Sequence, residues 1–244
     1  MKNRISTWAI LGLVTVAALF QGELSISAQT TAAAKEKREQ QREGRKEVRE
    51  ATSVLRKIMS VPDKAIPREL LEKAEGIGVF PGVIKAGFIF GGRGGDGVVA
   101  RRTPKGWSTP VFYNIGGGSF GAQIGAQKTD YIMLFMNEGS LQDLLDDKLE
   151  FEGNLSFAAG PVGRTIGAGT NLSAEAGILV YSRSKGLFAG ATIGGAVLTA
   201  DNSINEAFYG MNGGEVLKHP DSVNMANVSA DLRRFSDTVR MYAK

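Results

Sequence analysis

The chain of 244 residues contains no cysteine. This absence excludes disulfide bonds, thiolate metal ligands, a cysteine nucleophile and bacterial lipid attachment through cysteine. There is one histidine, His219, and the formal net charge is only +4. We therefore expect no metal site, no cofactor and no nucleic-acid partner. An apolar fraction of 43% is nevertheless enough to fill a globular core.

The N-terminus also lacks an apolar run long enough to span a bilayer comfortably. Lys2 and Arg4 precede an apolar run from Trp8 to Phe20, and small polar residues follow. This is the layout of a signal peptide over residues 1–28, with cleavage after Ala28 or one residue earlier. An uncleaved N-terminal anchor is the alternative. We expect an exported protein that is periplasmic or secreted, either free or peripheral on a membrane.

Two zones follow the expected cleavage point. Residues 29–45 are charged and predict a solvated extension, and residues 46–244 predict a single domain. Within that domain, residues 46–60 carry apolar side chains at a spacing of about 3.5 residues, which indicates an amphipathic helix. The helix either docks on the core or lies on a membrane surface. Its basic residues suit a membrane surface: Arg45, Lys46, Arg49, Arg56 and Lys57. Its apolar face lacks tryptophan and phenylalanine, which favours docking.

Glycine is abundant instead, and 26 of the 32 glycines fall in residues 76–195. Here the apolar residues alternate, as in "SFGAQIGAQ", which is typical of β-strands. Eight to ten short strands predict an antiparallel sheet or barrel-like core. Repeated glycines on one face let a sheet coil or let another backbone approach closely. With amphipathic helices at both ends, the fold class is α+β.

Three helices are expected around the sheet. One begins at Pro67 and ends at Gly76. The second lies in "GSLQDLLDD", where Ser140 is the expected N-cap and Asp143 completes a capping-box-like pair. The third covers about residues 222–243, with an apolar stripe that closes against the sheet.

Two glycine motifs resemble catalytic or cofactor motifs. Gly117, Ser119 and Gly121 match the nucleophile elbow of α/β-hydrolases, and His219 lies downstream. The alternating residues after Ser119 predict a strand, whereas an elbow requires a helix there. We therefore expect no catalytic residue. A hydrolase would place Ser119, an acid and His219 within hydrogen-bond reach.

The stretch "GGRGGDG" has the spacing of a dinucleotide-binding loop at residues 92–97, but "VVARRT" after it is strand-like. It predicts a flexible hairpin turn. "DNSINEAF" begins like a calcium loop but lacks its later glycine and glutamate.

Basic residues at or near expected turns and strand ends are candidates for headgroup binding: Lys85, Arg93, Arg101, Arg102, Lys105, Arg164, Arg183 and Lys185. If several converge on one face, they form an anion site. If they do not converge, they are scattered solubilising charge.

Three long stretches carry a resemblance: "AEGIGVFPGVIKAGFIFGGRGGDGVV", "GWSTPVFYNIGGGSFGAQIGAQKTD", and "YSRSKGLFAGATIGGAVLTAD" followed by "FYG". Together they resemble the SYLF domain family over roughly residues 50–212. The resemblance implies a compact domain without known enzymatic activity. Eukaryotic members bind phosphoinositide-containing membranes, and some fungal members bind and bundle actin. The chain departs from the eukaryotic pattern in having an export signal and no SH3 or FYVE module.

The resemblance also implies lipid contact through an N-terminal helix and basic surface residues. Residues 46–60 occupy the place of that helix, and Lys85, Arg164, Arg183 and Lys185 stand inside the matching motifs. We expect a non-enzymatic module that binds anionic phospholipid headgroups. The alternative is a structural or protein-interaction module, with actin, an envelope partner or a second copy bound. One positive patch beside residues 46–60 favours lipid, and a neutral apolar patch favours protein.

Overall fold

A computed structural model describes residues 8–61, 65–87, 90–120, 125–151, 157–163 and 176–244 of the protein. Its helices are α1 (Trp8–Met59), α2 (Arg68–Lys73), α3 (Gln142–Leu145), α5 (Asn202–Tyr209), α6 (Gly213–Lys218) and α7 (Ala230–Tyr242), with 3₁₀ helices η1 (Glu138–Leu141) and η2 (Pro220–Ser222). In this part of the chain no helix has the length and apolarity needed to cross a bilayer.

The strands form one sheet of ten strands among the described residues. They are β1 (Gly76–Gly87), β2 (Phe90–Thr103), β3 (Gly106–Trp107), β4 (Val111–Phe120), β5 (Gly125–Phe135), β6 (Lys148–Glu150), β7 (Phe157–Ala159), β8 (Ile178–Ser184), β9 (Leu187–Gly190) and β10 (Ala196–Ala200). The order is β6-β10-β4-β2-β1-β5-β8-β7, while β3 pairs with β2 and β9 with β8. Every pair is antiparallel except β7 with β8.

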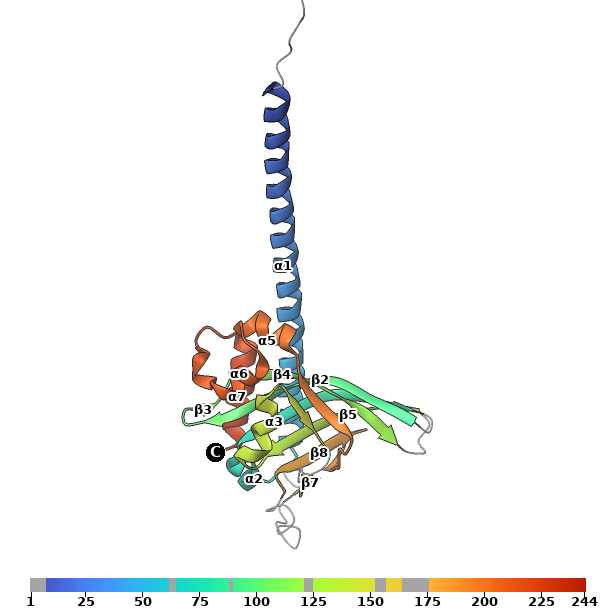
Figure 1. Cartoon of the computed structure of the whole chain (residues 1–244). Helices are drawn as coiled ribbons and strands as arrows, with labels where there is room; N and C mark the ends of the chain where they lie inside the picture. The colour runs from blue at the N-terminus through green and yellow to red at the C-terminus, as the bar shows by residue number, and fades with distance from the viewer. Residues whose placement is uncertain (1–7, 62–64, 88–89, 121–124, 152–156, 164–175) are drawn as a thin grey trace, which may run out of the picture.

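This architecture confirms the predicted α+β class and the antiparallel sheet. The sheet curls into a half-barrel, and the long strands β1, β2, β4 and β5 extend past the helices as an arm (Figure 1). Strand β5 lies in the interior of the sheet, between β1 and β8.

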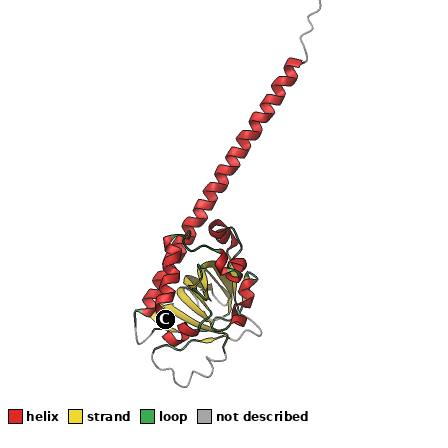
Figure 2. Cartoon of the chain, turned by 90° about the vertical axis from the view of Figure 1, so that its left-hand side faces the viewer, coloured by secondary structure: helices red, strands yellow, loops and turns green. Residues whose placement is uncertain are grey.

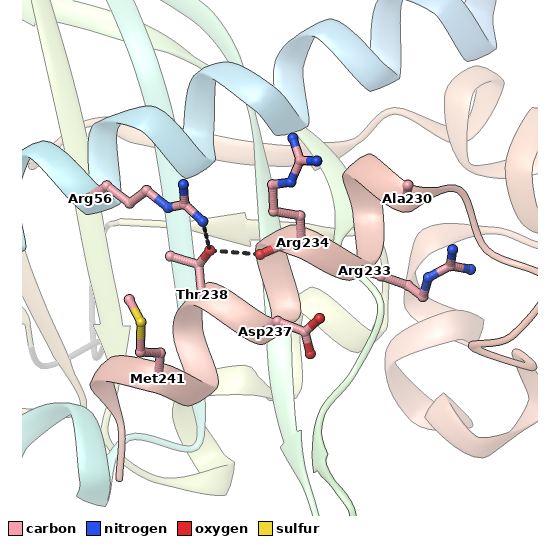
Figure 3. Close-up of a pocket in the computed structure, with 7 residues that line it drawn as sticks. All are labelled: Arg56, Ala230, Arg233, Arg234, Asp237, Thr238 and Met241. Atoms are coloured by element: carbon pink, nitrogen blue, oxygen red, sulfur yellow. Dashed lines mark hydrogen bonds between the residues drawn. The ribbon is translucent and has the colours of Figure 1, made fainter.

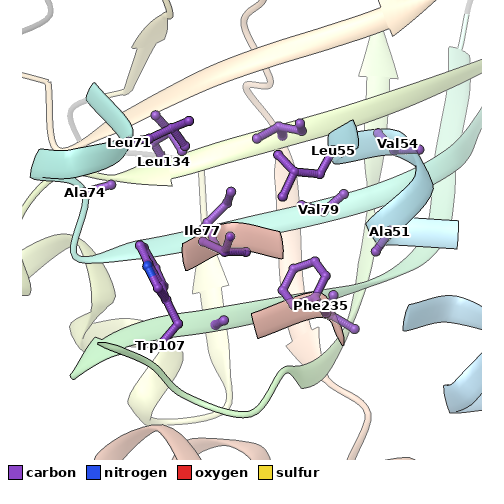
Figure 4. Close-up of a cluster of buried hydrophobic side chains, with 14 of the residues drawn as sticks. Ala51, Val54, Leu55, Leu71, Ala74, Ile77, Val79, Trp107, Leu134 and Phe235 are labelled. Atoms are coloured by element: carbon purple, nitrogen blue, oxygen red, sulfur yellow. The ribbon is translucent and has the colours of Figure 1, made fainter. Parts of the chain in front are cut away.

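Each face of the sheet has its own core. On the α1 face, α1 and α7 pack Leu55 and Phe235 against Val79 of β1 (Figure 4). On the opposite face, Phe80 and Tyr113 pack with residues of α3 and α6. Side chains alternate along a strand, so the two cores use alternate residues of the same strands. The docking of the N-terminal and C-terminal helices is as predicted.

Helix α1 has a docked part and a projecting part. Val48, Ala51 and Leu55 are buried, whereas residues 31–39 are exposed. The N-terminal part continues away from the body as the same straight helix (Figure 2). The expected cleavage point after Ala28 falls inside this helix.

The motif "GGRGGDG" is a strand, so the predicted hairpin turn is wrong. Gly92 lies opposite Ala86 of β1 and Gly118 of β4, so it is paired on both sides. The backbone groups of β2 find partners on both sides, and that pairing outweighs the preference of glycine for turns. Because this motif is part of β2, no helix N-terminus follows it that could bind a pyrophosphate.

Helix boundaries differ from the prediction in three places. Asn137, not Ser140, caps η1, because its side chain accepts a hydrogen bond from the Ser140 N–H at 2.8 Å. Helix α2 is capped by an extended Ala74, since Gly76 is already paired as the first residue of β1. Helix α7 begins at Ala230, because η2 and a loop occupy the preceding residues.

Candidate functional site

A hollow of about 330 Å³ lies between α1 and α7. Its lining is Arg56, Ala230, Arg233, Arg234, Asp237, Thr238 and Met241 (Figure 3). We call this the α1–α7 groove. It contains more cationic than anionic side chains and opens to solvent.

The spacing of charges along α1 explains the cationic side of the groove. Arg45, Arg49 and Arg56 are four and seven residues apart, so they follow one flank of the helix. That flank faces α7, because Arg49 pairs with Asp231 at 2.8 Å and Arg56 Nη2 donates to Thr238 Oγ1 at 3.3 Å.

Helix α7 supplies the other wall. Leu232, Phe235 and Val239 are buried against the sheet. Arg234, Thr238 and Met241 recur every three or four residues beside this stripe, and they line the groove. Thr238 Oγ1 also donates to the carbonyl oxygen of Arg234 at 2.7 Å, which fixes the hydroxyl inside the groove (Figure 3).

The carboxylates near the groove are already paired elsewhere. Asp237 lies 3.3 Å from Arg240, and Asp231 forms an ion pair with Arg49 at 2.8 Å. Arg234 reaches Asp231 only at 3.9 Å. Among the described residues, Arg56 has no carboxylate partner. The groove therefore keeps unneutralised positive charge.

Arg233 has a structural task. Its Nη1 donates to the carbonyl oxygens of Ala226 at 3.0 Å and of Val228, which fastens the loop before α7. Arg56 and Arg234 remain for a ligand, whereas the Thr238 hydroxyl already donates to the Arg234 carbonyl and accepts from Arg56. Guanidinium groups bind phosphate oxygens through two parallel hydrogen bonds, so the arrangement suits a phosphate group. Met241, which is 52% exposed, adds an apolar contact at the rim.

The candidates at the end of β2 have structural partners. Arg102 donates to the carbonyl oxygens of Ala74 and Leu71, both at 2.7 Å, and its guanidinium lies 4.6 Å from the Trp107 ring centre. It thus caps the C-terminus of α2. Arg101 pairs with Glu138 at 2.7 Å and donates to the Leu217 carbonyl at 3.0 Å.

Two more candidates are held in the same way. Arg183 of β8 pairs with Asp130 of β5 at 3.2 Å. Arg93 of β2 donates to the carbonyl oxygens of Ile193 and Gly194 at 3.3 and 3.2 Å, which ties the loop before β10 to the sheet.

The remaining candidates lie apart from one another. Lys85 is opposite Arg93 in the ladder, and Lys185 is in the β8–β9 turn with a left-handed φ of 49°. Lys105 pairs with Asp221 at 3.0 Å. Arg164 lies outside the described residues. Lys85 and Arg101 are at opposite ends of the β1–β2 hairpin, so the set does not form one patch.

On α1, the candidate residues divide between the groove and solvent. Arg49 and Arg56 belong to the groove flank, and Arg45 follows the same flank. Lys46 is exposed and lies 3.9 Å from Glu50, and Lys57 is exposed in the last turn.

Sequence reasoning missed Arg233, Arg234 and Thr238, because α7 was considered only for its apolar stripe. The signal available was a pair of arginines directly beside that stripe.

The other flank of α1 is acidic. Burial, and then the nearby carboxylates of Asp96, Asp201, Glu43 and Glu50, raise the pKa of Glu47 to about 8. Burial and Asp201 also raise the pKa of Asp96, while Lys46 opposes that shift. Acidic groups from α1, β2 and the start of α5 therefore converge on the side of α1 that faces away from α7.

The arrangement of Ser119 does not form a nucleophile elbow. Strand β4 continues through Ser119 to Phe120, and Ser119 lies opposite Gly91. His219 is the exposed C-cap of α6 and lies 3.9 Å from Glu215. The described part of the chain contains no group of three or more potential metal ligands.

The sheet, the two docked helices and the groove between them define a small α+β domain. A family model described as "Ysc84: Las17-binding protein actin regulator" matches residues 116–239, which is half of the chain. The chain therefore belongs to the Ysc84/SYLF family, and the resemblance found in its sequence is confirmed.

Curated relatives agree with this assignment. The chain is 34% identical over 154 residues to LAS seventeen-binding protein 3 of Saccharomyces cerevisiae, covering 62% of this chain and 33% of the relative. It is 34% identical over 170 residues to SH3 domain-containing YSC84-like protein 1 of Homo sapiens, covering 67% and 49%. Protein YSC84 of Saccharomyces cerevisiae is 33% identical over 175 residues, covering 68% and 37%. The chain thus spans a third to a half of the length of these relatives.

Proposed function

We propose that this protein is a non-enzymatic module that binds anionic phospholipid headgroups at a membrane surface after its export. The observation that carries the proposal is the α1–α7 groove, where Arg56 and Arg234 lie beside the Thr238 hydroxyl and the nearby carboxylates are paired elsewhere.

A headgroup phosphate fits this chemistry. The guanidinium of Arg56 binds the phosphate oxygens, Arg234 adds a second cation, and Thr238 Oγ1 positions Arg56 by accepting its hydrogen bond. Met241 then contacts the acyl boundary beside the headgroup. Each arginine near an anionic surface contributes about 1 kcal/mol, and salt weakens that attraction.

The test is co-sedimentation of the full chain with vesicles at low and high salt. Phosphatidylcholine vesicles are compared with vesicles that also contain phosphatidylglycerol or phosphatidylinositol. We expect salt-sensitive pelleting with the anionic vesicles only. Arg56→Ala and Arg234→Ala should each weaken binding about fivefold, which corresponds to the loss of about 1 kcal/mol.

Lys105→Ala is the matched control, because it removes one exposed cation that does not line the groove. An equal loss for Lys105→Ala and Arg56→Ala contradicts a role for the groove and leaves only general charge. Pelleting with neither vesicle contradicts lipid binding altogether.

Binding to a protein partner is the second candidate, because the family description and the names of the yeast relatives refer to Las17 binding and actin regulation. Co-sedimentation of the same preparation with filamentous actin distinguishes the two candidates. Pelleting with filaments but not with vesicles would favour the protein partner.

A further inference from the structure

The arm carries a sheet face that no helix covers in the described structure. Val98 and Phe112 pack against the helices on the α1 face, and alternate residues further along β2 and β4 continue that face without cover. The uncovered face consists of Ile84, Gly92, Gly94, Gly116, Gly118 and Lys128, which the ladder places side by side. We call it the open arm face.

This face can receive another backbone. A Cβ atom built on Gly92, Gly94, Gly116 or Gly118 meets no atom within 4 Å. Ile84, in register with Gly94, is 55% exposed. A face of four bare glycines beside an exposed isoleucine is smooth and allows close approach by a helix.

Acidic residues lie beside the open arm face, at the side nearer the helices. Asp96 follows Gly92 and Gly94 on the same face of β2, on the side nearer the helices. It lies near Glu47 of α1, where burial first, and then the Asp96 carboxylate, raise the pKa of Glu47 to about 8, so Glu47 is mostly protonated at neutral pH. Glu43 lies one helical turn before Glu47 on the same flank. The negative charges of Asp96 and Glu43 repel an anionic membrane and attract a basic helix.

The same chain presents a basic helix with no partner. Lys35, Arg38 and Arg42 are three and four residues apart, so they form one stripe that runs from the projecting part of α1 to its contact with α5, where Gln41 donates to the Ala207 carbonyl. All three are exposed, and none has an ion pair within the described part of the chain. Three alanines at residues 32–34 leave the neighbouring helix surface small.

The stripe cannot reach the open arm face of its own chain. Helix α1 runs straight away from the body on the N-terminal side of Gln41, while the arm lies beside its docked end (Figure 1). We propose that the open arm face binds residues 32–42 of α1 of a second copy of this chain. The basic stripe of one copy then faces Glu43 and Asp96 of the other.

Site-specific cross-linking tests this contact in the full chain, which contains no cysteine of its own. Ala34→Cys marks the helix, and Gly92→Cys marks the open arm face, where the side chain has space. The two variants are mixed and oxidised, and the mixed dimer is quantified by mass. Ala34→Cys mixed with Leu187→Cys is the control, because Leu187 is 70% exposed away from this face.

We expect the Ala34–Gly92 pair to cross-link at least about tenfold faster than the control pair, because binding raises the effective concentration of the two thiols. Equal rates for the two pairs would overturn the proposal. Faster cross-linking of either variant with itself would indicate a symmetric contact and would also overturn it.

Charge reversal supplies a second readout. Lys35→Glu with Arg38→Glu should slow the cross-link about fourfold or more, since exposed ion pairs contribute up to about 1 kcal/mol each. Lys37→Glu is the matched control, because Lys37 lies on another side of the same helix. Mixing the reversed helix with Glu43→Lys and Asp96→Lys on the arm copy should restore the rate. Equal effects of Lys37→Glu and the stripe variant would contradict the proposed orientation.

Discussion

At the scale of single residues, Asn205 links α5 to the start of β4, just beyond the last pair of the β4–β10 ladder. Its side chain is fully buried, accepts a hydrogen bond from the Phe112 N–H at 2.9 Å and donates to the Phe112 carbonyl at 3.0 Å. The amide therefore completes β4 where no neighbouring strand pairs with Phe112 on that side.

We expect Asn205→Ala to lower the free energy of unfolding by about 1–3 kcal/mol, because the buried Phe112 N–H loses its partner, whereas the Phe112 carbonyl keeps the hydrogen bond from the Asp201 N–H. Urea unfolding measures the change. Glu206→Ala, on the exposed side of the same helix, should stay within about 0.5 kcal/mol of the parent. Similar losses for both variants would contradict the role of Asn205.

Asn205 also makes a contact that the sequence alone could not predict. The stretch "DNSINEAFYG" lacks the later glycine and glutamate of a calcium loop. In the structure, Asp201 is the N-cap of α5, and its side chain accepts a hydrogen bond from the Ile204 N–H at 3.1 Å. The buried partner of Asn205 lies 93 residues earlier in the chain. No local pattern specifies a contact over such a separation.

At the scale of elements, α1 is organised by three flanks. Val48, Ala51 and Leu55 dock, the arginine flank faces α7, and the acidic flank faces the arm. The 3.5-residue rhythm predicted the docked flank. The charged stretch around Gly44 contains no pattern that predicts a close contact at this glycine.

Gly44 sets how closely α1 approaches α5. A Cβ atom at this position would lie 2.7 Å from the Phe208 ring and 2.8 Å from Ile204. We expect Gly44→Ala to lower the free energy of unfolding by about 1–3 kcal/mol, because overpacking outweighs the better helix propensity of alanine.

Thermal unfolding measures this change, with Glu43→Ala as the exposed neighbour that should have little effect. A higher melting temperature for Gly44→Ala, as expected for a solvent-exposed helical glycine, would contradict the close approach.

At the scale of the whole molecule, Glu47 couples stability to pH. Burial first, and then the carboxylates around it, raise its pKa from 4.5 to about 8. The native state therefore holds a proton that the unfolded chain releases between these values. The free energy of unfolding must fall as pH rises from about 4.5 to about 8.

We expect Glu47→Gln to flatten this dependence. At pH 5 the variant should resemble the parent, and at pH 8.5 it should be more stable by about 1–2 kcal/mol, allowing for the partial exposure of the side chain. Urea unfolding at several pH values measures the difference. Glu50→Gln, exposed and beside Lys46, is the control. Parallel pH profiles for the parent and Glu47→Gln would contradict the raised pKa.

The sequence by itself determined the strand alternation, the amphipathic helices at both ends and the family, because each depends on residues close together or on long contiguous motifs. It could not determine which basic residues share a site. Arg101, Arg102 and Arg183 follow the same turn-and-strand pattern as Lys185, yet their guanidiniums are held by Glu138, Ala74 and Asp130.

Only the tertiary structure brought Arg56 to Arg234, and only the ladder register placed Gly94 beside Gly116. Both contacts join segments that are far apart in the chain, and packing of the whole sheet and its helices decides them. Local spacing fixes the flank of an element on which a residue lies. The neighbour that this flank meets depends on how the elements assemble.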